Sequence, residues 1–338
     1  MFHNSLEKVI NNKDLMEDEM IDVMENIMEN KVSDISKASF LTALKMKGET
    51  VTEIRGAAKV MRKKVSQVDL SEYNTLDTCG TGGDGLNTYN ISTAAGIICA
   101  ANGVMVVKHG NRSVSSKSGS ADVLEALGMN INLKSDLVRA SVKEENFGFF
   151  FAPNFHSAMK NVMNTRKSLG FRTIFNILGP LTNPAFAKTQ ILGVFNADLT
   201  ETLAEVLMGL GVKRALVVHG MDGLDEITID GKTKITEVKD GQLNTYYIHP
   251  EMYGLKSAKN SLLMGGEAKE NAKIIEEIFN GKKGPMRDVL LLNAGAALYV
   301  NDRVNSIASG IKLAEETIDS KKALYKLNRI IERSKVKI

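Results

Sequence analysis

The sequence predicts an α/β protein in which a small all-helical domain is joined to a larger α/β domain with a central, mainly parallel sheet. Three observations lead to this prediction. Residues 1–65 place apolar side chains at helical spacing. From Leu76 onward, short apolar runs alternate with helical patterns, as in parallel α/β sheets. Two loops in that region are rich in glycine, hydroxyl and basic residues, which suits a ligand with more than one phosphate group.

The first helical region has an apolar face marked by methionine. Methionine recurs at every fourth position, as Met16, Met20, Met24 and Met28. This stripe has two interpretations, a helix-packing core or a subunit interface, and both remain open. Further along, Thr50 with Glu53 three residues later predicts a capping box for a helix that runs to about Lys64.

The later elements follow from the same rules. Apolar runs predict strands at Val104–Val107, Phe147–Ala152, Gln190–Phe195 and Ala215–Val218. Helical patterns cover Ser92–Ala101, Ser120–Leu127, Asn154–Phe175, Thr200–Leu210, Glu267–Phe279 and Arg287–Val300. Alternation around Asp240-Gly241 predicts a hairpin over Lys234–Ile248.

Composition excludes several classes of function. The 43 basic and 40 acidic residues leave a net charge of +3, too balanced for nucleic acid or a membrane surface as the main partner. The absence of tryptophan argues against a stacking surface for single strands. Two cysteines, Cys79 and Cys99, cannot form a disulfide framework or a thiolate zinc site, and we interpret them as small core residues. No apolar signal segment begins the sequence, so we expect a cytoplasmic protein.

The first phosphate-type loop is GTGGDG, which begins at Gly80. Its glycines let backbone amides approach an anion without a Cβ in the way, and it carries one carboxylate, Asp84. The segment Asn90–Thr93 then opens a helix, whose positive dipole end favours anions. The spacing fits neither the Walker pattern nor a dinucleotide fingerprint. The alternative is a tight strand-to-helix turn without a ligand.

The second loop presents cations and small donors directly after an apolar strand. It contains Lys108, His109, Gly110, Asn111, Arg112, Ser113, Val114, Ser115 and Ser116, followed by Lys117, Ser118 and Ser120. Lys108 and Arg112 are candidates to neutralise a phosphate or pyrophosphate. The alternative is a solvated basic loop. His109 is a candidate general base, although its neighbours favour a role in shaping the pocket.

Two further groups of residues are candidates for metal or ligand binding. Asp225 and Glu226 follow a predicted strand, where paired carboxylates suit a Mg²⁺ ion that bridges to phosphates; the alternative is a pair of exposed loop acids. Arg166 and Arg172 lie in a basic segment, where one of them would bind a ligand carboxylate in a bidentate contact. The alternative is that these arginines are simply cations on the surface of a helix.

Six blocks of the sequence resemble the anthranilate phosphoribosyltransferase family. They are Gly80–Gly85, Asn90–Thr93, Lys108–Ser116, Gly119–Gly128, Gly170–Ala185 and Arg287–Val300, in the family's order. Ser113 and Tyr89 depart from the usual alanine and phenylalanine, and each adds only a hydroxyl. The resemblance implies transfer of the 5-phosphoribosyl group of phosphoribosyl pyrophosphate (PRPP) to the amine of anthranilate, in tryptophan biosynthesis.

The resemblance also implies the domain layout. Residues 1–70 with 154–180 would form the helical domain, which carries the dimer contact and the anthranilate side. Residues 71–153 with 181–338 would form the α/β domain, which binds PRPP and Mg²⁺. The active site would lie in the hinge cleft. A homodimer through the helical domains would favour the interface interpretation of the methionine stripe.

Site residues carry over by matching position. The PRPP contacts would be Gly80, Gly83, Asp84, Thr88, Asn90, Ile91, Ser92, Thr93, Lys108, His109, Gly110, Asn111, Arg112, Ser113, Val114, Ser115, Ser116 and Ser120. The anthranilate contacts would be Gly80, Asn111 and Arg166. Two Mg²⁺ ions per subunit are implied, one held by Ser92 and the other by Asp225 and Glu226. The resemblance assigns no residue as a general acid or base.

Two other functions share this fold. A pyrimidine nucleoside phosphorylase resembles the chain over Gly119–Glu125, but it would need phosphate and no Mg²⁺, which the GTGGDG loop and the Asp225-Glu226 pair disfavour. A non-enzymatic, nucleic-acid-binding relative would have a strongly basic surface, which the balanced charge disfavours.

Overall fold

A seven-stranded sheet forms the centre of the computed structural model, which describes residues 2–113 and 117–336. The strand order is β3-β2-β1-β4-β5-β6-β7; the first five are parallel and the last two antiparallel. The strands are β1 (Leu76–Gly80), β2 (Val106–Gly110), β3 (Phe147–Phe151), β4 (Thr189–Gly193), β5 (Arg214–Gly220), β6 (Thr233–Lys239) and β7 (Gln242–Ile248). The predicted class, a helical domain joined to a mainly parallel sheet, is confirmed.

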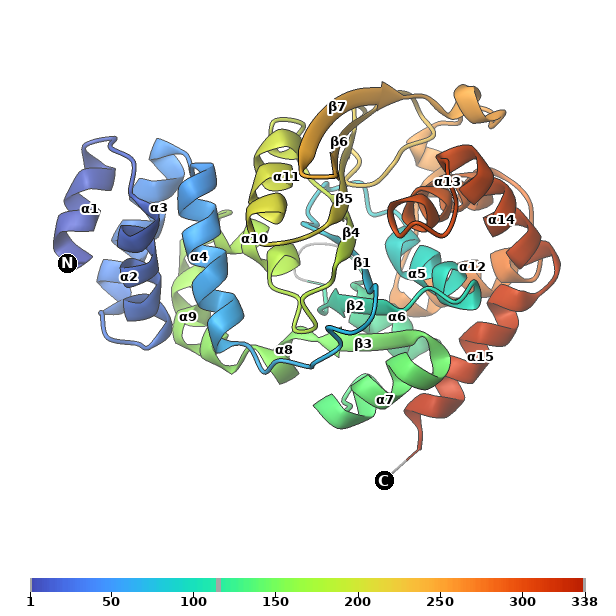
Figure 1. Ribbon diagram of the computed structural model, residues 1–338, viewed down its shortest axis with the longest axis horizontal. Helices are drawn as coiled ribbons and strands as arrows, with labels where there is room; N and C mark the ends of the chain where they lie inside the picture. Colours follow the sequence, from blue (N-terminus) through green and yellow to red (C-terminus); the bar gives the residue numbers. More distant parts are fainter. Residues whose placement is uncertain (1, 114–116, 337–338) are drawn as a thin grey trace.

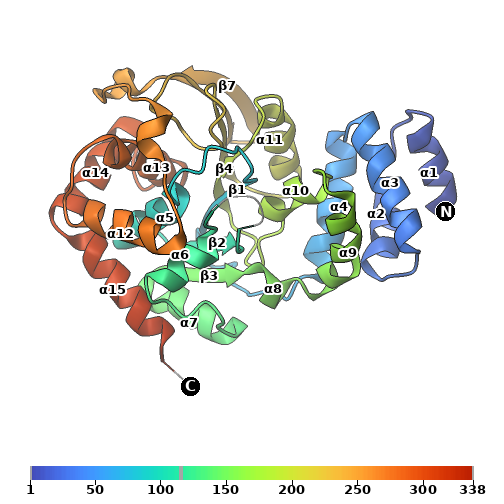
Figure 2. The ribbon, with the colours of Figure 1, turned by 180° about the vertical axis from the view of Figure 1, so that it is seen from behind.

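Helices cover both faces of this sheet (Figures 1 and 2). One face packs against α5 (Ile91–Ala101), α6 (Ser120–Ala126), α12 (Ala268–Phe279), α13 (Pro285–Val300), α14 (Ile307–Asp319) and α15 (Lys322–Ser334). The other face packs against α7 (Ser135–Glu145), α11 (Leu199–Gly209) and the helical unit. Strand side chains alternate between the two cores: Leu216 and Val218 of β5 face the first, and Val217 faces the second.

The helical unit forms a lobe at one end of the molecule (Figure 1). It contains α1 (Phe2–Ile10), α2 (Glu17–Met28), α3 (Asp34–Lys47) and α4 (Val51–Lys64), and α9 (Lys160–Leu169) packs against α2 and α3. Short helices α8 (Ala152–Phe155) and α10 (Phe175–Leu178) join α9 to the sheet. The predicted capping box is confirmed, because the Thr50 hydroxyl accepts from the Glu53 amide at 3.3 Å and Glu53 accepts from the Thr50 amide at 2.8 Å.

The interface interpretation of the methionine stripe is wrong for three of its four members. Met20 and Met24 are fully buried and Met28 is 3% exposed, all within one core that also contains Val162 of α9. Packing of α2 on α4 and α9 therefore covers the stripe inside the chain. Only Met16, at the start of α2, is exposed.

Most predicted elements agree with the structure to within a few residues. The hairpin is confirmed: β6 and β7 turn at Asp240 (φ 52°) and Gly241 (φ 73°), a conformation that favours these residue types. The predicted helix over Asn154–Phe175 is interrupted, because α9 ends at Leu169, Gly170 follows in the left-handed region, and α10 starts only at Phe175. The apolar pattern of the sequence also did not predict α7.

The strand order places a switch point between β1 and β4. β1 leads through α5 to β2 on one side, whereas the neighbouring β4 leads through α11 to β5 on the other. Chains leaving the carboxyl ends of β1 and β4 therefore diverge, and ligands of such sheets bind at this switch point. None of the described helices is both long enough and apolar enough to cross a membrane.

Candidate active site

The glycine loop lies directly after β1, at the switch point. Gly82, Gly83 and Gly85 have φ angles of 66°, 83° and 78°, a left-handed conformation that other residues adopt at a cost. The amides of Gly83, Asp84 and Gly85 have no acceptor in the described part of the chain. Successive unpaired amides in such a turn form a concave site for an anion. The loop can therefore receive a phosphate group.

Three carboxylates converge behind this loop, from Asp84, Asp225 and Glu226. Burial, together with the nearby charges of Asp84 and Glu226, holds the pKa of Asp225 well above its usual range. Asp84 accepts from the Leu86 amide through Oδ1, but its Oδ2 is buried without a hydrogen-bond partner in the described residues. The adjacent Asp225 carboxylate supplies only another acceptor while both are ionised. Mutual repulsion at this point favours a bound cation.

Ser92 and Lys108 border the same acids. The Ser92 hydroxyl and amide interact with Glu226, and Lys108 Nζ lies 3.5 Å from the Ser92 hydroxyl. Lys108 is almost fully buried and donates to the carbonyl oxygen of Thr78. Burial raises the pKa of Glu226 to about 7, although the Lys108 charge acts to lower it.

The oxygen donors fit Mg²⁺, which prefers hard oxygen ligands and keeps several waters. In the described residues, no three His, Cys, Asp or Glu side chains are arranged to hold a metal by themselves. Asp225 with Glu226 would thus supply part of one coordination shell and the Ser92 hydroxyl part of another, with phosphate and water oxygens supplying the rest. A metal that binds together with a phosphorylated ligand matches this arrangement.

A buried network that the sequence did not reveal braces β1 against β2. Asp77 accepts from the His109 amide at 3.2 Å and from the Asn183 side chain at 2.7 Å. Burial raises the pKa of Asp77 to about 6. Asn183 also donates to the Val107 carbonyl, so one side chain ties two strands together. No sequence motif marks Asp77 or Asn183, because their partners are distant along the chain.

The second loop is organised by Asp122 of α6, another residue that the sequence analysis missed. Its Oδ2 accepts from the amides of Ser113 and Gly119, each at 2.9 Å. Arg112, a predicted phosphate ligand, directs its guanidinium to Asp122 and Glu125, both at 2.9 Å. The Ser120 hydroxyl donates to the carbonyl of Asn111 at 3.4 Å. The candidates Val114, Ser115 and Ser116 lie outside the described residues.

His109 and His156 form a buried pair, with ring centroids 5.1 Å apart. His109 Nδ1 lies 3.2 Å from the carbonyl of Gly179, so this nitrogen carries the hydrogen. Burial and the neighbouring His156 lower the pKa of His109 to about 3, and burial lowers that of His156 to about 4. Both rings are therefore neutral near pH 7, and His109 is poorly suited to act as a general base.

This pair should make folding sensitive to acid. Both pKa values are lower in the folded state than in the unfolded chain, so the stabilisation is complete above about pH 6.5 and is lost as pH falls toward 4. Each histidine lowers the unfolding free energy by about 1.4 kcal/mol for each pH unit of acidification in that window. Asp77 and Glu226, with raised pKa values, act in the opposite direction. We therefore expect His156→Asn to flatten the decline in unfolding free energy between pH 6 and 5 by about 1.4 kcal/mol relative to its parent.

Urea denaturation at each pH measures this slope. His3→Asn is the matched control, because His3 is exposed on α1. A His156→Asn slope equal to that of the parent would show that His156 does not stay neutral in the folded state.

The two candidate arginines have different surroundings. Arg166 of α9 lies over the Phe175 ring at 5.5 Å, and no carboxylate pairs with it in the described residues. Burial lowers its pKa. Arg172 instead donates to the carbonyl of Gly83 in the glycine loop and lies 4.2 Å over the Phe195 ring. Arg166 thus keeps its donors free for a ligand carboxylate, whereas Arg172 contacts the loop itself.

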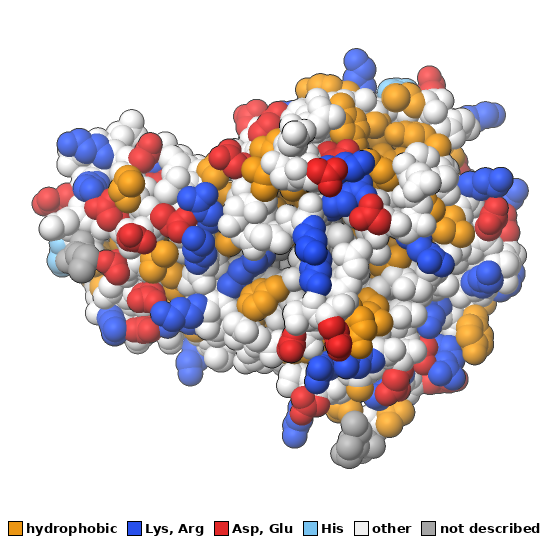
Figure 3. All heavy atoms as spheres, in the orientation of Figure 1, with side chains coloured by type: hydrophobic (Ala, Val, Ile, Leu, Met, Phe, Trp, Pro, Cys, Tyr) orange, Lys and Arg blue, Asp and Glu red, His pale blue; other side chains and the backbone are white. Residues whose placement is uncertain are grey.

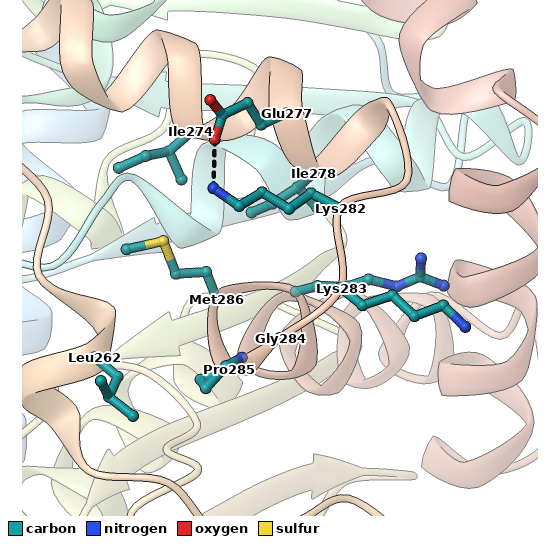
Figure 4. A pocket seen from close by; sticks show the side chains of 10 residues that line it. Leu262, Ile274, Glu277, Ile278, Lys282, Lys283, Gly284, Pro285 and Met286 are labelled. Carbon is teal, nitrogen blue, oxygen red and sulfur yellow. Dashed lines mark hydrogen bonds and ion pairs between the residues drawn. The ribbon is translucent and has the colours of Figure 1, made fainter.

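A cavity of about 240 Å³ lies at the turn between α12 and α13, away from the acids. Figure 4 shows its largely apolar lining and the ion pair of Glu277 with Lys282 at 2.7 Å. It touches the site only indirectly, because the buried Tyr89 donates its hydroxyl to the carbonyl of Met286 at 2.6 Å. The extra hydroxyl of Tyr89 thus anchors the segment that follows the glycine loop to α13.

Comparisons with known proteins identify the family of this chain. The model of the glycosyl transferase family α/β domain matches residues 72–324, and that of the family's helical bundle domain matches residues 4–65. Anthranilate phosphoribosyltransferase of Acetivibrio thermocellus is 55% identical over 332 residues, which cover 98% of this chain and 96% of that protein. The Alkaliphilus metalliredigens enzyme is 54% identical over 334 residues, covering 99% and 98%.

Solved structures give the same result. The anthranilate phosphoribosyltransferase of Thermus thermophilus superposes with a TM-score of 0.93 at 41% identity, covering 98% of this chain and 99% of that one. The Saccharomyces cerevisiae enzyme in complex with PRPP and Mg has a TM-score of 0.90 at 30% identity, covering 98% and 97%. Another structure of the yeast enzyme contains 4-fluoroanthranilate. The chain therefore belongs to the glycosyl transferase family and, within it, to the anthranilate phosphoribosyltransferases.

Proposed function

We propose that the protein transfers the 5-phosphoribosyl group of PRPP to the amine of anthranilate at this switch point. The reaction releases pyrophosphate and is a step of tryptophan biosynthesis. The observation that carries this proposal is the junction of unpaired loop amides with the Asp84, Asp225 and Glu226 carboxylates at the switch point. Amides suit the phosphate oxygens and carboxylates suit their Mg²⁺. The yeast relative in complex with PRPP and Mg supports these two ligands.

PRPP would lie along the glycine loop and the start of α5. In this proposal Gly80, Gly83, Asp84, Thr88 and residues 90–93 line the ligand, and Lys108, His109, Gly110, Asn111 and Ser120 complete the site. Arg112 and Ser113 would act through Asp122, which binds both of them and closes the second loop. Val114, Ser115 and Ser116 remain sequence-based predictions.

Mg²⁺ would bind at two places per subunit. Ser92 would hold one ion and Asp225 with Glu226 the other. Bound Mg²⁺ supplies positive charge that offsets the charge gathering on pyrophosphate as it leaves. The repulsion that raises the pKa of Asp225 supports a cation there, because a cation removes it.

Anthranilate would bind on the α9 side, through Gly80, Asn111 and Arg166. The Arg166 guanidinium suits the carboxylate because its fork of N–H donors matches two carboxylate oxygens. The aromatic amine is neutral near pH 7, so its lone pair can attack the ribose anomeric carbon without a strong base. The C–O bond to pyrophosphate breaks as the C–N bond forms, and the amine then loses a proton. We therefore assign the main rate effect to positioning.

The protein would act as a homodimer. Ile35 and Met46 of α3 are 80% and 84% exposed, and a spacing of eleven residues places them on one face of that helix. Two large apolar side chains exposed on one side of the helical unit support a contact between two copies. Residues 1–70 with 154–180 would make up the unit that carries it. Light scattering on Met46→Lys tests this proposal, because a shift toward the monomer mass is expected.

The alternatives fit the molecule less well. Figure 3 shows basic and acidic side chains interspersed over the visible face, rather than the basic stripe that nucleic acid would need. A nucleoside phosphorylase would not need three carboxylates beside its phosphate loop.

The decisive assay follows the fluorescence of anthranilate mixed with the protein, PRPP and Mg²⁺. We expect a decay that EDTA abolishes. A decay unaffected by EDTA would overturn the metal assignment. No decay, with PRPP still raising the unfolding temperature, would retain the phosphate site but assign another acceptor. Neither decay nor stabilisation would reject the function.

A single methyl group should disturb the metal side of this site. A Cβ at Gly193 would overlap the carbonyl oxygen of Asp225 and lie 2.7 Å from its carbonyl carbon. Backbone atoms cannot rotate away as a side chain can, so Gly193→Ala should displace the Asp225-Glu226 turn. We expect kcat/KM to fall about 100-fold, since a shift of about 1 Å costs that much.

The matched control is Gly231→Ala, where a Cβ meets nothing within 4 Å. Kinetics over a range of Mg²⁺ concentrations should show the loss at Gly193 alone. Equal activity of the two variants would mean that the turn tolerates the displacement.

A further inference from the structure

Arg172 contacts both turns that form the switch point, and none of the assigned roles uses it. It lies between the end of α9 and the start of α10, 89 positions after the glycine loop that it contacts. Its guanidinium donates to the carbonyl oxygen of Gly83, which follows β1, and lies 4.2 Å from the centre of the Phe195 ring, which follows β4. One side chain therefore spans the switch point.

The two turns are also joined beneath it. The Thr81 amide donates to the carbonyl of Gly193 at 2.8 Å, and the Thr81 hydroxyl accepts from the Phe195 amide at 3.2 Å. These hydrogen bonds tie the loop to the turn after β4 as far as Thr81, after which the loop has positive φ angles at Gly82 and Gly83. The part of the loop beyond Thr81 is therefore the part that most needs an external support.

Arg172 fixes the orientation of one peptide unit in that part. The unit joining Gly83 to Asp84 is planar and trans, so its carbonyl and its amide point in opposite directions. With the Gly83 carbonyl held by Arg172, the Asp84 amide points away from Arg172. That amide is one of those without an acceptor in the described residues. Holding the carbonyl thus presents an amide to the anion.

The fit leaves little room for another arrangement. A Cβ at Gly83 would overlap Arg172 Nη2 and lie 3.0 Å from Cζ, so the guanidinium packs directly on the Cα of a glycine. No carboxylate pairs with Arg172 in the described residues. Its planar group is used for a carbonyl and an aromatic ring, two partners for which a lysine is a poor substitute.

We propose that Arg172 is a positioning residue for the pyrophosphate group, acting through the Gly83-Asp84 peptide rather than by touching the substrate. This inference rests on the proposed function for the identity of the substrate, but the anion site itself can be tested without the acceptor. Loss of Arg172 should free the peptide to rotate and weaken anion binding. The chemical step, once PRPP is bound, should change much less.

The test measures binding of inorganic pyrophosphate, in the presence of Mg²⁺, by isothermal titration calorimetry. We expect Arg172→Ala to weaken binding about tenfold or more, and Arg172→Lys to fall between it and the parent, because lysine can still donate to Gly83. Lys167→Ala is the matched control: it removes one exposed cation from the same segment and touches neither turn. It should bind pyrophosphate like the parent.

Steady-state kinetics provides a readout that a merely structural role would not move. Arg172→Ala should raise the KM for PRPP about tenfold with kcat within about threefold, which is the signature of lost binding. Equal pyrophosphate affinity of Arg172→Ala and Lys167→Ala would overturn the inference. If Arg172→Ala does not fold, Arg172→Lys decides: about threefold weaker binding supports the role, and parental affinity overturns it.

The proposed function can fail separately. A parent protein that binds pyrophosphate but leaves anthranilate unchanged would reject the acceptor and leave the Arg172 comparison valid.

Discussion

A chain carrying both Asp225→Asn and Glu226→Gln is expected to lose its response to Mg²⁺ and to become more stable without metal. The two carboxylates lie beside Asp84, and burial with mutual repulsion raises the pKa of Asp225 and brings that of Glu226 to about 7. Neutral amides of the same shape remove this repulsion. The same change removes the anionic oxygens that would bind Mg²⁺.

The expected effects are opposite in sign. We expect kcat/KM to fall about 1,000-fold, as for the loss of a main electrostatic contact in an active site. This corresponds to about 4 kcal/mol of transition-state stabilisation. Unfolding free energy without metal should rise by about 1 kcal/mol, because functional sites often retain charges that the fold does not favour.

Kinetics with increasing Mg²⁺ and urea denaturation in EDTA measure the two effects. The control pair is Asp136→Asn with Glu205→Gln, which changes the net charge equally at exposed positions. An unaltered Mg²⁺ titration would reject the metal assignment. A loss of stability in EDTA would show that the acids brace the fold instead of straining it.

Local patterns predicted the parts of the site that are short in sequence. Three of the four glycines of GTGGDG have positive φ angles, and the segment from Asn90 begins α5 as expected. The Asp240-Gly241 turn was equally predictable, because its conformation depends on two adjacent residues. In each case the backbone requirement is met by residue types that few other conformations favour.

Contacts between distant segments could not be predicted in this way. Asp77 and Asn183 are 106 positions apart, and Arg172 and Gly83 are 89 apart. The members of each pair meet only because β4 inserts beside β1 in the sheet, and a local sequence pattern does not predict this strand order. The choice between Arg166 and Arg172 as a ligand contact had the same difficulty, since both are cations of one basic segment.

Periodicity also leaves the partner of an apolar face undefined. The methionine stripe of α2 has the same spacing whether it meets α4 and α9 or a second subunit. Arg112 is a similar case, because it forms ion pairs with Asp122 and Glu125, which lie one turn apart on α6. A basic residue in a phosphate-type loop can thus serve the loop rather than the ligand.

Arg166→Ala should raise the KM for anthranilate about 100-fold while leaving the KM for PRPP close to that of the parent. Hydrogen bonds to charged groups contribute about 1.5–3 kcal/mol each, so loss of a bidentate contact is a large change. Arg166 has no carboxylate partner in the described residues, and burial lowers its pKa. A partly buried, unpaired guanidinium gains more from an incoming carboxylate than a solvated one.

The substrate offers its own control. Aniline has the reacting amine of anthranilate but no carboxylate, so its kcat/KM should be the same for Arg166→Ala and the parent. Lys167→Ala, which removes the adjacent exposed cation, should resemble the parent with both amines. Arg166→Lys should recover only part of the anthranilate affinity, because an ammonium group lacks the planar fork. An unchanged KM for anthranilate in Arg166→Ala, or an equal loss with aniline, would place the carboxylate elsewhere in the site.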